Sequence, residues 1–219
     1  MSAQRLAAFC LLNLVPFLWG DSHEAPASPL VVYLSADPGQ SPRVLAYMQR
    51  ELGQLMQTAG YEVQWRDPHS PYASQTSAPL IVARLSGHCA LSAGDTPAAV
   101  SDKQALASTP VADGRVLPFS TVHCDNLTHT LEPLLAAEPG ARRDFLYGRA
   151  IARVLAHEFY HILLGATTHA AAGVAKPCFT PIDLVTERFE FEHSTLARLQ
   201  KHPDPSTEPT LTDDATGRD

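Results

Sequence analysis

Residues 156–169 read Ala-His-Glu-Phe-Tyr-His-Ile-Leu-Leu-Gly-Ala-Thr-Thr-His and contain His157-Glu158-x-x-His161, a glycine and a third histidine. On a helix, positions i and i+4 lie one turn apart on the same face, so His157 and His161 can direct ring nitrogens at one ion. Zinc binds histidine nitrogen, and catalytic zinc sites combine three protein ligands with a water. Glu158 lies beside the first ligand, where its carboxylate can take a proton from that water. The spacing therefore predicts a zinc site with Glu158 as general base.

The residues around this motif predict one long amphipathic helix from Arg143 to Leu164. Apolar residues recur there at helical spacing and form one stripe, made of Ile151, Val154, Leu155, Phe159 and Ile162. Glu158 falls on the same stripe, where a buried carboxylate without a partner would be costly. A metal site gives a reason for an acid at this position.

Two residues compete for the place of third metal ligand. Gly165 predicts the end of the helix, because glycine tolerates the left-handed conformation after a last turn, and a chain that turns back there can present His169 to the ion. The rival is Glu187, a glutamate on a later predicted helix. We favour His169 and keep Glu187 as the alternative. A surface helix with solvated histidines and no metal also fits so short a motif.

Length and charge limit the class of protein. A chain of 219 residues suits one domain with tails and is long enough to bury a core. Its formal net charge is −7, and no basic patch is present to neutralise phosphates. We therefore expect no nucleic acid partner.

The two ends of the chain differ from the middle. Residues 1–27 predict a signal peptide, since Arg5 precedes an apolar run from Leu6 to Trp19 that is too short for a comfortable membrane span. We expect a secreted or periplasmic protein with no stable membrane span after leader removal; the alternative is an uncleaved anchor. The mature domain would then be residues 28–202, followed by a disordered tail over residues 203–219, which are rich in Pro, Thr and Asp.

Three cysteines remain once such a leader is removed. An exported protein can keep a disulfide. Cys89 and Cys124 each follow an apolar, strand-like run and are our first candidates for a pair, which leaves Cys178 free. The sequence alone does not fix this pairing.

Strands and a helix are predicted in the first half of the chain. Three short segments predict strands: 30–34 is continuously apolar, 61–65 alternates with polar residues, and 80–85 is mostly apolar. Ser41-Pro42 predicts the start of a helix between the first two strands, and Gly60 its end. The strand at 80–85 is a candidate edge to which an extended substrate could add.

The second half completes the expected fold. Residues 115–124 predict an extended stretch that Pro118 interrupts, and residues 127–137 a short helix. Thr180-Pro181 predicts the start of a last helix that reaches Leu199. The fold class expected is α/β (α+β): a small domain with a twisted mixed sheet packed on a long active-site helix, plus a C-terminal helix.

The small sheet, the long motif helix, the glycine stop and the downstream histidine together resemble the metzincin branch of the zincin metalloproteases. More narrowly, the chain is similar to small exported bacterial zincin-like proteins with a third histidine eight residues after the second. Residues 113–119 and 173–176 add to this likeness. The resemblance implies zinc on His157, His161 and His169, with Glu158 as general base.

This chain departs from typical metzincins in two ways. Those place the glycine three residues and the third histidine six residues after the second histidine, whereas Gly165 and His169 here follow at four and eight. They also have a methionine turn beneath the metal. No methionine follows Met56 in this chain, so Val174 or Ala175 would have to fill that place.

These expectations combine into a zinc-dependent peptidase that acts on a peptide or protein substrate. The alternative is an exported zinc-binding protein that interacts with a partner and catalyses nothing. The intact Glu158 favours the peptidase.

Overall fold

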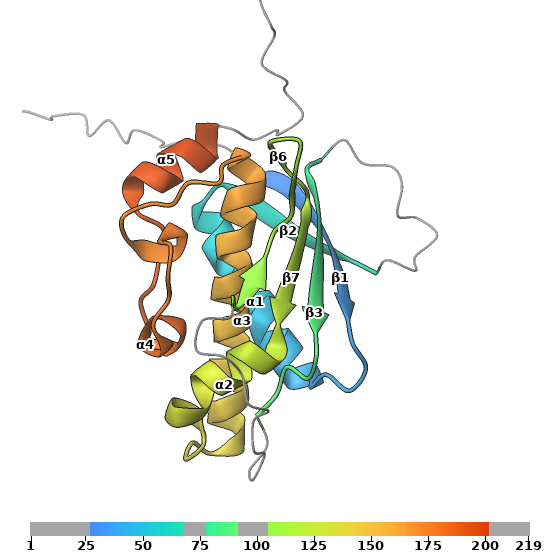
Figure 1. The fold of residues 1–219 in the computed structure, drawn as a ribbon, viewed down its shortest axis with the longest axis vertical. Helices are drawn as coiled ribbons and strands as arrows, with labels where there is room; N and C mark the ends of the chain where they lie inside the picture. Colours follow the sequence, from blue (N-terminus) through green and yellow to red (C-terminus); the bar gives the residue numbers. More distant parts are fainter. Residues whose placement is uncertain (1–26, 68–77, 92–104, 202–219) are drawn as a thin grey trace, which may run out of the picture.

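A mixed sheet with helices packed against one face forms the domain (Figure 1), and the computed structural model describes residues 27–67, 78–91 and 105–201. The sheet has the order β2-β1-β3-β7-β4, with β2 (Tyr61–Arg66), β1 (Ser28–Ala36), β3 (Leu80–Ser86), β7 (Phe119–His123) and β4 (Ala107–Ser108). β1 is parallel to β2 and β3, β3 is parallel to β7, and β4 is antiparallel to β7. The predicted fold class is confirmed.

Two helices pack against each other over the sheet, α1 (Pro42–Thr58) and α3 (Gly140–Leu164). They lie close together at Gly148, where an added Cβ would lie 2.6 Å from the Cβ of Tyr47 and 2.7 Å from the carbonyl oxygen of Val44. These distances are shorter than van der Waals contact, so a side chain at residue 148 would push the helices apart. Through this contact, α1 and the sheet fix the position of the helix that carries the motif.

The ends of α1 and α3 follow from local sequence. Ser41 caps α1, with its side-chain oxygen accepting from the amide of Val44. Gly165 ends α3 in the left-handed conformation with a φ of 56°, as predicted. The start of α3 at Gly140 lies three residues before the predicted Arg143, because the first turn carries no large apolar residue that would mark it in the sequence.

The strand at the edge of the sheet beside α3 is β4, which the sequence did not predict. Our candidate edge at 80–85 is wrong, since β3 lies between β1 and β7 and is paired on both sides. β4 is followed by a hairpin of β5 (Val111–Ala112) and β6 (Arg115–Val116). Its turn is Asp113-Gly114, with φ values of 51° and 75°, as expected for a two-residue hairpin turn.

The last helix was predicted as one element and is two, α4 (Pro181–Val185) and α5 (His193–Lys201). The guanidinium groups of Arg149 and Arg153 on α3 both donate to the carbonyl of Thr186, at 3.1 and 2.7 Å. These bonds satisfy the carbonyl just after α4 and hold the chain against α3 instead of letting the helix continue. Phe189 and Phe191, which we had assigned to the helix, lie in the connection.

A disulfide joins Cys89 and Cys124, the pair that we favoured, and Cys178 is a free, exposed cysteine. Cys89 follows β3, and Cys124 begins α2 (Cys124–Leu135) directly after β7. Because β3 and β7 are adjacent and parallel, the bond connects the carboxyl ends of two neighbouring strands.

The predicted signal peptide, apart from residue 27, and the predicted C-terminal tail lie outside the described residues. In the part of the chain that is described, no helix combines the length and the apolar character that crossing a bilayer requires.

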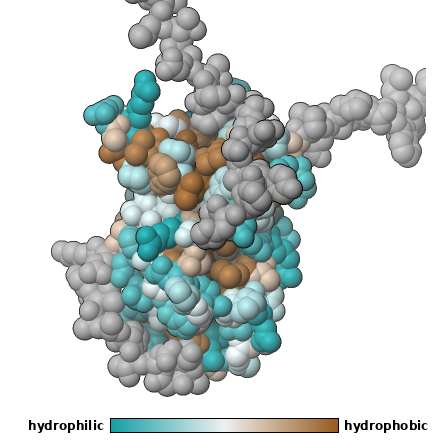
Figure 2. All heavy atoms as spheres, turned by 90° about the vertical axis from the view of Figure 1, so that its right-hand side faces the viewer, coloured by the Kyte–Doolittle hydropathy of each residue, from teal (hydrophilic) through white to brown (hydrophobic). Residues whose placement is uncertain are grey.

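The sheet face opposite the helices carries some apolar surface. Figure 2 shows this side of the molecule, and apolar side chains gather in its upper part. Leu80 and Phe119, at the starts of β3 and β7, are 37% and 48% exposed. The strands therefore do not place all their apolar residues against the helices.

Candidate metal centre

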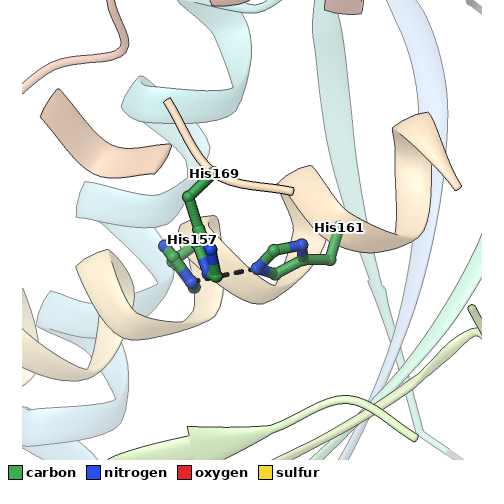
Figure 3. Close-up of side chains that lie close together, drawn as sticks. All are labelled: His157, His161 and His169. Atoms are coloured by element: carbon green, nitrogen blue, oxygen red, sulfur yellow. Dashed lines mark hydrogen bonds between the residues drawn. The ribbon is translucent and has the colours of Figure 1, made fainter. Parts of the chain in front are cut away.

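Three histidines meet at the C-terminal half of α3. His157 and His161 project from neighbouring turns of the helix, and His169 returns to them from the segment after Gly165 (Figure 3). One ring nitrogen from each of the three lies within 4.8 Å of the others. In the part of the chain that is described, this is the group of potential metal ligands that the fold assembles. The prediction that His169 comes back to the motif is therefore correct in geometry.

The two helical imidazoles present the same nitrogen to the centre. His157 Nδ1 lies 2.8 Å from the carbonyl oxygen of Val174, and His161 Nδ1 lies 2.7 Å from that of Ala166. A carbonyl oxygen only accepts, so each Nδ1 carries a proton; in a neutral ring, Nε2 is then the nitrogen with the lone pair. Such carbonyl partners orient metal-binding histidines in known sites. Val174 belongs to the short helix η1 (Gly173–Ala175) and is fully buried.

The lone pairs of the helical histidines face each other. The two Nε2 atoms of His157 and His161 are 3.1 Å apart. Two ligands of a tetrahedral zinc ion, each at roughly 2.0–2.1 Å from the metal, are separated by about 3.3 Å. The observed spacing thus fits a shared cation.

The surroundings of His157 and His169 keep these two rings in the form that a metal requires. Burial lowers the pKa of His157 to about 4, and the neighbouring His161 and His169 add to this effect. Burial, with a smaller contribution from His161, also lowers the pKa of His169. Neutral imidazole is the species that binds metal ions. At neutral pH His157 and His169 therefore offer lone pairs rather than positive charge.

Glu158 is buried beside the histidines and has one strong partner. The Thr109 hydroxyl, just after β4, donates to Glu158 Oε2 at 2.5 Å. Burial raises the pKa of the Glu158 carboxyl above its usual range, while the Thr109 bond acts in the opposite direction. A carboxylate with a raised pKa is a better proton acceptor. Sequence reasoning missed Thr109, because 49 residues separate it from Glu158 and no spacing rule connects them.

Two hollows meet at this centre and share His157 and Glu158 as lining residues. The larger, of about 560 Å³, extends past Leu106, Val154 and Phe179. The smaller, of about 350 Å³, lies between the hairpin residues Val111 and Val116 on one side and His161 and His169 on the other. Glu158 therefore borders both hollows.

Glu187, the alternative third ligand, Cys178 and Tyr160 are placed elsewhere or used differently. Glu187 is exposed in the connection between α4 and α5 and does not join the histidine cluster. Cys178 lines the larger hollow near its rim. The hydroxyl of Tyr160 donates to the carbonyl of Thr168 at 2.9 Å, so it is committed within the protein.

No protein-family model matches this chain, and no curated protein is detectably similar to it. The function must therefore be inferred from the residues of the site.

Proposed function

We propose that this protein is a zinc-dependent peptidase that hydrolyses peptide bonds of a peptide or protein substrate. One observation carries the proposal: three imidazoles converge next to a buried carboxylate, at the meeting point of two hollows. The resemblance of the motif to that of zincins agrees with this arrangement, but the proposal does not depend on the resemblance.

The donor set suits zinc. It consists of three nitrogen ligands and leaves room for a further ligand, which is the composition of catalytic zinc sites. His157, His161 and His169 would hold the ion. When bound there, zinc would lower the pKa of a water molecule and polarise the substrate carbonyl.

Glu158 would move the protons. Its carboxylate would accept a proton from the attacking water, whose oxygen adds to the carbonyl carbon. The same proton would pass to the leaving amine as the carbon–nitrogen bond breaks, giving a free carboxylate and a free amine. Thr109 would hold one oxygen of Glu158 in place through its hydrogen bond and leave the other oxygen, Oε1, for the water.

The hollows suit an extended chain with an uncharged side chain. A substrate that crosses the centre can occupy space on both sides of Glu158. Lys176 lines the larger hollow, but its ammonium group is paired with Asp183 at 2.7 Å. With this charge neutralised and with Leu106, Val154 and Phe179 in its walls, the larger hollow favours an apolar side chain.

Export is part of the proposal. The leader predicted at residues 1–27 would direct the chain out of the cytoplasm. The Cys89–Cys124 disulfide supports this, because such bonds persist in oxidising compartments.

The test is a measurement of metal content and peptide cleavage on the purified full chain. We expect stoichiometric zinc and cleavage of a mixed peptide library that a chelator stops and added zinc restores. Glu158→Gln should keep the zinc and lose cleavage, whereas His161→Ala should lose both. Zinc without any cleavage would favour the non-catalytic zinc-binding protein, and a wild-type chain without zinc would overturn both functions.

A further inference from the structure

We infer that Tyr160 is a positioning residue that holds the third histidine, His169, in place for the metal. The inference rests on the zinc site of the proposed function but not on peptide cleavage. Tyr160 lies on α3 directly before His161 and is fully buried, yet its hydroxyl reaches the backbone just before His169.

The loop that carries His169 is tied to α3 at two carbonyl groups. The ring of His161 donates to the carbonyl of Ala166 at 2.7 Å, and the hydroxyl of Tyr160 donates to the carbonyl of Thr168 at 2.9 Å. Thr168 is the residue immediately before His169, so this second bond acts closest to the ligand. A third bond, from the amide of Ala170 to the carbonyl of Ala175, fixes the chain on the other side.

His169 needs such support because little else orders it. Thr167, Thr168 and His169 are all exposed. The His169 ring contacts the rings of His157 and His161, but it makes no hydrogen bond to another described residue. A ligand on a free loop would have to be ordered each time the metal binds, and that loss of conformational freedom weakens affinity. The hydrogen bond from Tyr160 to Thr168 lowers this cost, because it orders the backbone beside His169 before the metal binds.

Tyr160 acts through the backbone and does not belong to the reacting groups. Its ring packs beside the other two ligands, with centroid distances of 5.1 Å to His161 and 6.5 Å to His157. It lines neither hollow, and its hydroxyl is turned to Thr168. It is therefore poorly placed to donate to a developing oxyanion, a role that a tyrosine within the motif would otherwise suggest.

The experiment compares Tyr160→Phe with Tyr147→Phe in the full chain. Tyr147 is a matched control: it is also fully buried on α3, and its hydroxyl also donates to a backbone carbonyl, that of Cys124, at 3.2 Å. We expect Tyr160→Phe to weaken zinc affinity, measured by competition with a chromogenic chelator, by roughly 10-fold, as loss of an outer partner does in known zinc sites. Tyr147→Phe should leave the affinity unchanged.

A second set of variants, made in the His169→Ala background, distinguishes positioning of His169 from a general loss of order around the site. With His169→Ala already present, adding Tyr160→Phe should weaken zinc binding no further, because there is no third imidazole left to position. In the wild-type background, cobalt bound in place of zinc should show a changed visible spectrum in Tyr160→Phe and the native spectrum in Tyr147→Phe.

Equal zinc affinity in Tyr160→Phe and wild type would overturn the inference. So would an equal loss in the Tyr147 control, or the same loss when His169 is absent. If the wild type binds zinc but cleaves no peptide, the peptidase fails while these affinities still decide the role of Tyr160. If the wild type binds no zinc, both proposals fall.

Discussion

The site has two unlike halves, a helical half with His157 and His161 and a loop half with His169. On the helix, each ring is fixed by a bond from Nδ1 to a backbone carbonyl, and the two Nε2 atoms already lie 3.1 Å apart. On the loop, the ring of His169 is exposed and only its backbone is tied. The difference teaches that a candidate metal centre can be preorganised unevenly: two of its histidines are already held in place, and the third can adjust.

The contrast is tested most strongly by deleting one ligand from each half. We expect His161→Ala to weaken zinc affinity by more than about 100-fold, the upper end of what losing an outer partner costs. His169→Ala should lose less, because the helical pair keeps its geometry. Chelator competition measures both, and thermal unfolding of the metal-free variants checks that each is folded. If His169→Ala loses as much zinc affinity as His161→Ala, the helical pair does not contribute more to binding than the loop histidine.

The helical half depends on how firmly α3 is anchored, and Arg153 provides one anchor. It is 1% exposed, lies one turn before His157, and bonds Glu51 at 3.3 Å and the carbonyl of Asp183 at 2.6 Å. Without Arg153 the carbonyl of Asp183 loses its charged donor and Glu51 keeps only Arg149, at 3.3 Å, so we expect Arg153→Met to lower the free energy of unfolding by about 2 kcal/mol.

A surface pair between the same two helices serves as the control for Arg153. Arg43 on α1 lies 3.5 Å from Asp144 on α3, but its side chain is 60% exposed. Arg43→Met should cost at most about 0.5 kcal/mol, because exposed ion pairs contribute little. Urea unfolding of the metal-free proteins measures both; similar losses in the two variants would mean that Arg153 is not an anchor.

The smallest expected change in stability concerns Asp183, which pairs with Lys176. Burial acts to raise the pKa of Asp183, but hydrogen bonds from Lys176 and Thr180 outweigh it and hold the pKa below its usual 3.8. The resulting stability is present above pH 3.8 and is lost as the pH falls through the folded-state pKa. Asp183→Asn should therefore be less stable than wild type near pH 7, by roughly 0.5 kcal/mol. The gap should close toward pH 3 in melting curves of the metal-free protein; a gap independent of pH would rule out this carboxylate as the cause.

Much of the site's first layer could be predicted from local sequence. The spacing of His157 and His161 is a property of any helix, and Gly165 marks its end, so the return of His169 could be expected. Thr109 and Tyr160 could not be found in this way. Their partners are set by tertiary packing, which brings an edge strand to Glu158 and a buried phenol to the loop.

The fold shows the same division. The start of α1 at Ser41-Pro42 and the end of α3 at Gly165 are local signals, and both are confirmed. The break after α4 depends on two arginines more than 30 residues earlier in the chain, and β4 is two residues long, too short for any periodicity. One local signal was available and unused: Asp113-Gly114 is a strong hairpin signature.

The Cys89–Cys124 bond has a consequence for the unfolded chain. It closes a ring that contains Thr109, the partner of Glu158, since the linked cysteines are 35 residues apart. In the chain-entropy picture, a ring of this size removes roughly 4 kcal/mol worth of freedom from the denatured ensemble. Even when the domain opens transiently, the disulfide keeps the edge strand β4 close to the ends of β3 and β7. Closing again onto the carboxylate is then a local search rather than an encounter between distant parts of the polypeptide.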